Sequence, residues 1–223
     1  MTVQQIALLV TPPALLISTQ ITFRWAGRTL GPRWGYLCGF LSYWGIWCLA
    51  VPWRLLGKQG IAALFVVGTH LIGQPMWVGA VLLSLPLLLG YGYAFPRVVR
   101  GADLTLLVAS AALAAINAVL EELLWRGAYI ATFHDSWLLG VAYPAVGFGI
   151  WHLSPQVIHP NPAPGGKLSF VAVSVVIGLM WGWVAFAASS ILMTSIVHLL
   201  FDFSGLGARV YLRYSEGKPS PAT

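Results

Sequence analysis

Apolar runs of membrane-spanning length, separated by short polar or proline-rich segments, repeat along the first 208 of the 223 residues of the chain. A run of about 17–25 apolar residues is long enough to cross the hydrocarbon core of a bilayer as a helix. Since a helix satisfies its backbone hydrogen bonds internally, such a chain is expected to fold as a bundle of transmembrane helices. The pattern predicts an all-α polytopic protein with about seven spans, at 4–22, 35–52, 75–95, 104–133, 137–153, 168–187 and 190–208.

The segment 59–73 is the ambiguous part of this pattern. It is short and rich in glycine, so it can be an interfacial segment, a re-entrant one or an eighth crossing. With seven spans, one side of the membrane carries nine Arg and Lys residues, whereas the other carries Arg54, Lys58 and Arg126. The positive-inside rule then places the N-terminus outside and the C-terminus in the cytoplasm. An extra crossing would scramble this asymmetry, so the charges favour seven spans.

The composition supports a membrane location. Hydrophobic residues make up 58% of the chain and charged residues 8%, whereas soluble domains have about 25% charged residues. We therefore interpret residues 1–223 as one integral, multi-pass domain surrounded by membrane lipids. The net charge of +6 comes from loop residues and indicates topology rather than nucleic-acid binding. The polar residues 214–223 are expected to form a disordered tail.

Two adjacent carboxylates and a guanidinium interrupt the fourth span. They belong to Glu121, Glu122 and Arg126, and apart from Glu216 the chain has no other glutamate. Each charge at the centre of a bilayer costs roughly 2.5–3.5 kcal/mol on insertion scales, so such residues face the protein interior, have partners or take part in chemistry. Glu122 and Arg126 are four residues apart and can pair on one helix face. Glu121 is rotated by about 100° from Glu122, so the two carboxylates cannot make the same contacts.

Three more polar residues fall at membrane depth in later spans. His152 lies near the end of the fifth span, and His198 and Asp202 share one helix face in the seventh. If the fourth and fifth spans form a hairpin, the depths of Glu121 and His152 agree within roughly 5 Å. We therefore expect Glu121 and His152 to meet near the middle of the membrane.

These groups favour hydrolysis by an activated water over other membrane chemistries. The chain has no His-Glu-x-x-His zinc motif, no Gly-x-Ser-Gly serine motif and no second deep aspartate for an aspartyl dyad. A carboxylate and an imidazole on facing helices can hold a water molecule and remove its proton. A second imidazole can donate a hydrogen bond to the oxyanion that forms when the water attacks an amide. The alternative for each group taken alone is a structural role in helix packing.

The three motifs together resemble the CPBP family. This family comprises type II CAAX prenyl endopeptidases and bacterial relatives tied to bacteriocin processing and immunity, also called Abi. The likeness covers about 115–205, within the predicted catalytic helices at 104–208. It is carried by Glu121-Glu122-x-x-x-Arg126 followed by Gly127, Phe148-x-x-x-His152 and His198-x-x-x-Asp202.

The resemblance implies a glutamate-type endopeptidase, without a metal cofactor, in a bacterial or archaeal cell membrane. It implies that Glu121 is the base that activates water, with His152 as its partner. It implies that Glu122 and Arg126 shape the site or hold the substrate backbone, and that His198 is the oxyanion donor.

Asp202 departs from the pattern of the family, which often has asparagine at this position. An ionised aspartate cannot donate a hydrogen bond to an oxyanion. We therefore expect Asp202 to orient His198 through one ring nitrogen, which leaves the other N–H for the oxyanion.

Other functions remain open at this point. Two imidazoles and a carboxylate are an acceptable catalytic zinc set, so a metalloprotease could use Glu121, Glu122, His152 and His198 as ligands. A peptide-binding or immunity protein without catalysis, or a proton-coupled transporter, could use the same buried groups. The expected partner is a peptide or protein substrate, cut near a terminus or in a membrane-proximal stretch, with or without a lipid modification.

Overall fold

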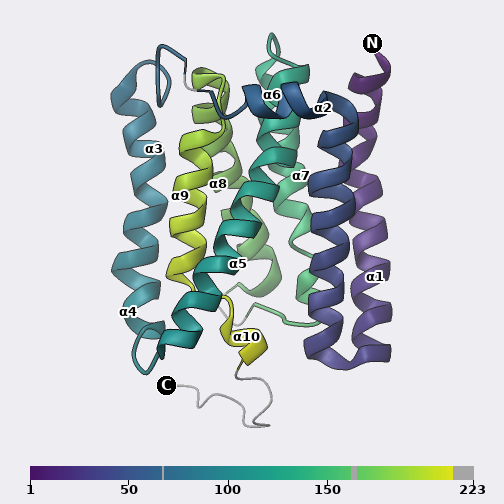
Figure 1. Ribbon diagram of the computed structural model, residues 1–223, viewed down its shortest axis with the longest axis vertical. Helices are drawn as coiled ribbons and strands as arrows, with labels where there is room; N and C mark the ends of the chain where they lie inside the picture. The colour runs from purple at the N-terminus through teal and green to yellow at the C-terminus, as the bar shows by residue number, and fades with distance from the viewer. Residues whose placement is uncertain (67, 162–164, 213–223) are drawn as a thin grey trace.

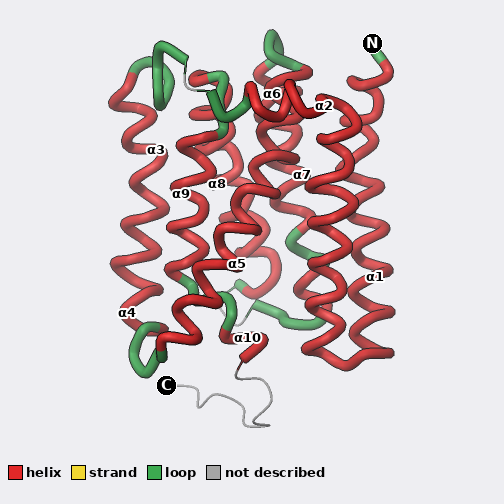
Figure 2. Tube along the Cα trace, in the orientation of Figure 1, coloured by secondary structure: helices red, strands yellow, loops and turns green. Residues whose placement is uncertain are grey.

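The computed structural model describes residues 1–66, 68–161 and 165–212, and the predicted tail at 214–223 lies outside this part. Every regular element in the described residues is a helix (Figure 2), as the all-α prediction requires. The helices run along the long axis of the molecule, with the N-terminus at one end and α10 near the other (Figure 1). In chain order the elements are α1 Val3–Ser42, η1 Tyr43–Ala50, α2 Val51–Ala63, α3 Met76–Leu89, η2 Gly90–Ala94, α4 Phe95–Val98, α5 Leu104–Glu122, η3 Leu123–Ala128, α6 Tyr129–Thr132, η4 Leu138–Ala142, α7 Tyr143–Trp151, η5 Pro155–Val157, α8 Gly166–Ala188, α9 Leu192–Ser204 and α10 Arg209–Leu212.

The first helical stretch, Val3–Ala63, doubles back on itself. Its backbone leaves the helical region at Gly31, with φ 77° and ψ 168°, and again at Gly57, with φ 66° and ψ 179°. These positive φ values are accessible to glycine at no steric cost. Figure 1 shows the chain reversing at the first break and lying across the end of the bundle after the second. The predicted spans 4–22 and 35–52 are therefore the two limbs of one antiparallel pair.

Pro12 and Pro13 lie inside α1, and the backbone there stays within helical geometry. Pro12 and Pro13 have no N–H, so the carbonyl groups of Leu8 and Leu9 lose their intrahelical donors. Two tyrosines from the other half of the chain replace them. The Tyr129 hydroxyl donates to the Leu8 carbonyl at 2.8 Å, and the Tyr143 hydroxyl donates to that of Leu9. These bonds join α1 to α6 and to the start of α7, so the proline pair serves helix packing.

Among the described residues, four helical stretches are long and apolar enough to cross a membrane: Val3–Ala63, Met76–Val98, Leu104–Thr132 and Gly166–Ala188. The protein is therefore a multi-pass membrane protein, and the exact number of seven spans stays a prediction. α7 and α9 have 9 and 13 residues and are too short to cross a bilayer by themselves. In the segment 59–73, residues 59–63 end α2 and the described residues after them are irregular.

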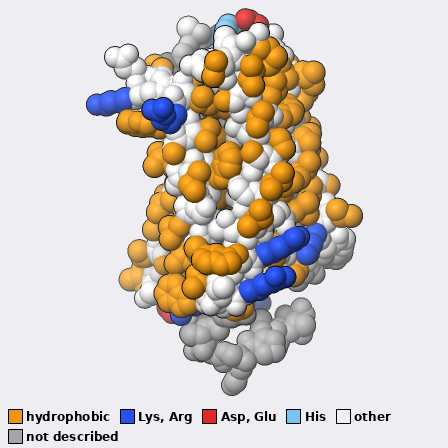
Figure 3. Space-filling model, turned by 90° about the vertical axis from the view of Figure 1, so that its right-hand side faces the viewer, with side chains coloured by type: hydrophobic (Ala, Val, Ile, Leu, Met, Phe, Trp, Pro, Cys, Tyr) orange, Lys and Arg blue, Asp and Glu red, His pale blue; other side chains and the backbone are white. Residues whose placement is uncertain are grey.

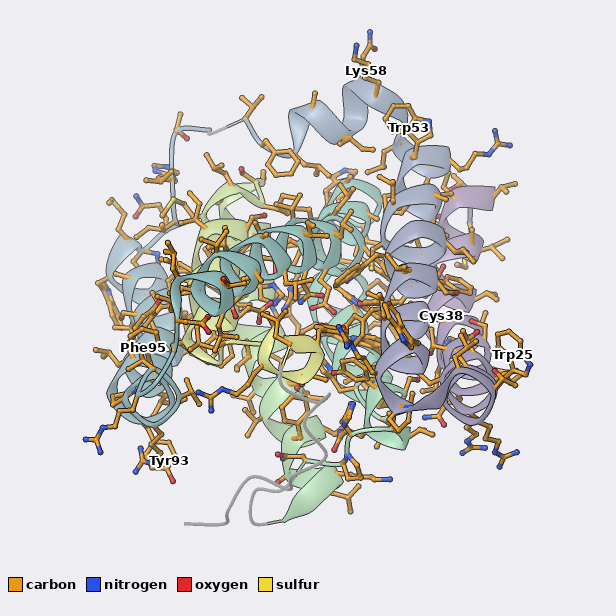
Figure 4. The ribbon with its side chains drawn as sticks, turned by 60° about the horizontal axis from the view of Figure 1, so that its bottom comes forward. Trp25, Cys38, Trp53, Lys58, Tyr93 and Phe95 are labelled. Atoms are coloured by element: carbon orange, nitrogen blue, oxygen red, sulfur yellow. The ribbon has the colours of Figure 1, made fainter. Side chains whose placement is uncertain are left out.

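The molecular surface has the character of a membrane-embedded protein. Apolar side chains cover the face shown in Figure 3, and the lysines and arginines gather toward its two ends. Trp25 and Trp53 are more than half exposed and point away from the bundle, as does Lys58 (Figure 4). Tryptophan and basic residues at the ends of an apolar band match the interfacial belts of membrane proteins.

Close helix packing holds the later helices around the site. α5 packs against α9, and α7 packs against α8. A Cβ atom at Gly178 of α8 would lie 3.1 Å from the Ala145 Cα atom of α7, and one at Gly182 would lie 2.9 Å from the Val141 side chain. Small residues four positions apart let two helices approach closely. The observed contact agrees with the packing role that this spacing predicts.

Candidate active site

The three charges of the fourth span are buried where α5 continues into η3. Glu121, Glu122 and Arg126 are 2%, 0% and 2% exposed. The predicted pair is present, with the Arg126 Nη1 atom 3.0 Å from Glu122 Oε1. The guanidinium also lies over the Phe148 ring, 4.5 Å from its centroid. η3 is a π-helical segment, a rare geometry that occurs frequently at functional sites. The charges therefore face protein and not lipid.

His198 lies at the centre of the carboxylates. Its Nδ1 atom is 2.9 Å from Glu122 Oε1, the same oxygen that pairs with Arg126. Its Nε2 atom lies 3.5 Å from Glu121 Oε2 and 3.6 Å from Asp202 Oδ2. The partner of one ring nitrogen fixes the orientation of the other. Glu122 therefore orients the ring, and the Nε2 atom points between the other two carboxylates.

This arrangement changes the position expected for Asp202. The sequence suggested that Asp202 would hold one ring nitrogen of His198, but the close partner is Glu122 on the facing helix. Asp202 Oδ2 accepts a hydrogen bond from Asn117 Nδ2 at 2.8 Å and lies farther, 3.6 Å, from the other ring nitrogen of His198. Helical spacing correctly put His198 and Asp202 on one face but could not show which atom each side chain would meet.

His152 occupies the C-cap of α7, where the helix ends beside the site. Its Nδ1 atom lies 2.7 Å from the carbonyl oxygen of Phe148, which fixes the ring. His152, Glu121 and Asp202 all line one cavity of about 440 Å³. Glu121 and His152, which were expected to meet, therefore face the same cavity but do not form a hydrogen bond with each other. Glu122, Arg126 and His198 are absent from the described lining of that cavity.

Four further side chains of the site were not predicted from the sequence. The Tyr43 hydroxyl donates to Glu121 Oε1 at 3.0 Å and accepts from Trp125 Nε1 at 2.7 Å. Trp44 Nε1 donates to Asn117 Oδ1 at 2.9 Å. Three of the four are aromatic, and aromatic side chains are common in membrane spans, so composition gave no signal for them. Asn117 was a possible signal, because it is an amide one helical turn before Glu121.

The candidate zinc ligands do not form a metal site in the described part of the chain. Within residues 1–66, 68–161 and 165–212, no group of three or more His, Cys, Asp and Glu side chains is arranged to hold an ion. Of the four ligands considered for zinc, Glu122 is paired with Arg126 and His198, and His152 has one ring nitrogen against a backbone carbonyl. The four side chains do not converge on one point in this conformation.

Residues 103–204 match the family model described as "Type II CAAX prenyl endopeptidase Rce1-like". The match agrees with the resemblance inferred from the three motifs and contains all six candidate site residues. It covers slightly less than half of the chain. No curated protein and no solved structure matches the chain at a significant level.

Proposed function

We propose that this protein is an intramembrane endopeptidase in which Glu121 activates a water molecule for attack on a peptide bond. The observation that carries the proposal is the setting of Glu121, a 2% exposed carboxylate on the wall of a cavity that His152 and Asp202 also line. The endopeptidase family matched by residues 103–204 supports the same reaction class.

The proposed reaction begins with a water molecule held in the cavity between Glu121 and His152. Glu121 accepts a proton from the water, and the resulting hydroxide attacks the carbonyl carbon of the substrate. The Tyr43 hydroxyl donates to Oε1 of Glu121 and fixes the carboxylate, so the proton from the water goes to Oε2. The proton then passes from Glu121 to the leaving nitrogen as the C–N bond breaks, which releases a carboxylic acid and an amine.

His198 is the proposed donor to the oxyanion. The ring does not line the cavity, so its Nε2 atom would reach the oxyanion between the Glu121 and Asp202 carboxylates, which do line it. With both ring nitrogens protonated, it donates through Nδ1 to Glu122 and through Nε2 toward Glu121 and Asp202. A donor that is fixed before the reaction stabilises the developing charge without a cost of reorganisation. Arg126 balances the charge of Glu122, and Glu122 holds the Nδ1 side of the His198 ring.

The proposed substrate is a peptide or protein segment near a terminus or close to the membrane, with or without a lipid modification. The cavity wall includes Gln156 and Asn161 from the segment between α7 and α8, and Tyr211 from α10. These elements lie at the end of the molecule opposite the N-terminus (Figure 1). With the N-terminus outside, as loop charge predicts, the cavity would receive its substrate from the cytoplasmic side.

The test is cleavage of membrane proteins and peptides by the purified protein in liposomes, read by mass spectrometry. The variants are Glu121→Gln and His152→Ala, each assayed with and without a strong chelator. Asp135→Asn and His134→Ala are matched controls, because both side chains lie in a loop and are 88% and 73% exposed. Cleavage that both site variants lose, and that the controls and the chelator leave intact, is the expected result.

Three other outcomes would change the proposal. Cleavage abolished by the chelator and restored by zinc would favour the metalloprotease, in which the four ligands would have to rearrange. No wild-type cleavage, together with unchanged cellular function in both site variants, would favour a peptide-binding protein. Loss of a proton-coupled flux in Glu121→Gln without any proteolysis would favour a transporter.

A further inference from the structure

Asn117 connects two helices to the candidate site through both ends of its side-chain amide. It lies on α5, one turn before Glu121. Its Oδ1 atom accepts from Trp44 Nε1 at 2.9 Å, and its Nδ2 atom donates to Asp202 Oδ2 at 2.8 Å. These three side chains and Glu121 line the same cavity. The amide therefore forms part of the wall at which the proposed reaction takes place.

The partners leave one orientation for the amide. An indole nitrogen can only donate, so the atom of Asn117 that faces Trp44 must be the oxygen. The NH2 group then faces Asp202, whose ionised carboxylate can only accept. Trp44 thus sets the direction of the amide, and the amide sets the position of the Asp202 carboxylate.

Asp202 in turn lies beside the nitrogen that the reaction is proposed to use. Its Oδ2 atom, which Asn117 holds, is the one 3.6 Å from His198 Nε2, and Glu121 Oε2 is 3.5 Å from the same nitrogen. A small displacement of Asp202 would leave His198 Nε2 facing Glu121 alone. Glu122 fixes the ring, and the amide of Asn117 therefore decides whether that N–H faces both carboxylates or Glu121 alone.

We propose that Asn117, held by Trp44, is a positioning residue that fixes Asp202 and so keeps His198 Nε2 directed between the two carboxylates. This inference rests on the proposed function for its catalytic consequence, but the contact itself can be tested without it. In this role Asn117 takes no part in bond making or breaking and acts through Asp202.

The sharpest test exchanges the donor and the acceptor. Asn117→Asp keeps the shape of the side chain and the acceptor for Trp44, but it places a carboxylate against Asp202. The double variant Asn117→Asp/Asp202→Asn restores the bond with its polarity reversed and leaves the total charge of the wild type. A hydrogen bond to a charged group changes the equilibrium constant between the bonded and unbonded arrangements by about 10- to 100-fold. We therefore expect Asn117→Asp to lower kcat about tenfold or more at nearly constant KM. The double variant should recover to within about threefold of Asp202→Asn.

A matched control separates positioning from general stability. Tyr91 of η2 donates to the Leu200 carbonyl of α9 at 3.0 Å and does not line the Glu121 cavity. Tyr91→Phe therefore removes another hydrogen bond to α9 and should lower the unfolding temperature without changing kcat. Equal kcat for Asn117→Asp and the wild type, or a double variant no more active than Asn117→Asp, would overturn the proposal.

Thermal unfolding in detergent supplies a second readout that needs no substrate. The unfolding temperatures of the wild type, the two single variants and the double variant form a double-mutant cycle. A positive coupling between positions 117 and 202 is expected even if no substrate is cleaved, and additive shifts would contradict the contact. Failure of the proposed protease activity and failure of this inference are therefore distinguishable.

Discussion

Glu121 and Glu122 are adjacent in the chain but face two different regions of the molecule. Glu122 is sealed between Arg126 and His198, and neither it nor these partners line the cavity. Glu121 lies on the cavity wall and receives a hydrogen bond from the phenol of Tyr43. The rotation of about 100° between consecutive helical residues therefore gives Glu122 a structural position and Glu121 a position on the cavity wall. Substitutions in the two regions should therefore fail in different ways.

The largest effect on activity is expected at Glu121. Glu121→Gln keeps the shape and the hydrogen bond from Tyr43 but removes the base, so kcat should fall by about 10²–10⁴-fold. The unfolding temperature should stay close to that of the wild type, because the amide oxygen of the replacement can still accept from the Tyr43 hydroxyl. Steady-state cleavage measures the fall in kcat, and thermal unfolding of the same preparation measures whether the stability is unchanged. Retained turnover in Glu121→Gln would remove Glu121 from the mechanism.

The matching change at Glu122 should act on stability first. Glu122→Gln leaves the buried Arg126 guanidinium without its counter-charge and weakens the bond to His198. Removal of one partner from a buried ion pair costs on the order of 3–5 kcal/mol. We expect a marked fall in the unfolding temperature in detergent and a loss of folded protein in membranes. A Glu122→Gln protein as stable as the wild type would show that the two regions do not differ as described.

Asp202 lies at the boundary between the two regions, and its substitutions should have intermediate effects. Asp202→Asn retains an oxygen that can accept from Asn117, so it should keep substantial activity. Asp202→Ala leaves the Asn117 N–H group without an acceptor and leaves His198 Nε2 facing Glu121 alone, so activity should fall about tenfold or more. The ratio of kcat values for the two variants is the measurement. Equal activity of Asp202→Ala and the wild type would exclude any positioning role for this side chain.

The fold was predictable from the sequence where hydrophobicity decides it. Apolar runs located the helices, and the four longest stretches are apolar enough to span a membrane. The reversal between residues 22 and 35 was predicted, but its placement at the single residue Gly31 and the unbroken helix through Pro12 and Pro13 were not. The first depends on a backbone conformation, and the second depends on two tyrosines more than 100 residues away. Local sequence carries no record of such distant partners.

The candidate site was predictable at the ionisable residues that lie inside apolar spans. Carboxylates and imidazoles stand out in an apolar chain because burial of charge is costly. Tyr43 and Trp44 do not stand out, because aromatic side chains also serve as lipid-facing residues. Helical spacing gave the correct pair of Glu122 and Arg126, both on one helix. It could not give the contact between Glu122 and His198, since that depends on how α5 packs against α9.

Tyr43 provides the smallest expected effect and the finest test of the Glu121 region. Tyr43→Phe removes the hydrogen bond to the Glu121 carboxylate and also the acceptor of the buried Trp125 indole N–H, which should lower stability somewhat. Its ring can still stack on Trp151, where the centroids are 3.6 Å apart. A bond to a charged group contributes about 1.5–3 kcal/mol, so we expect kcat to fall by about tenfold with the fold intact. Tyr129→Phe is the matched control, because this equally buried hydroxyl donates to the Leu8 carbonyl and neither residue lines the cavity. It should lower stability and leave the kcat of the folded protein unchanged. If both variants changed stability alone, Glu121 would need no orienting partner, and the cavity region would depend on its shape more than on its hydrogen bonds.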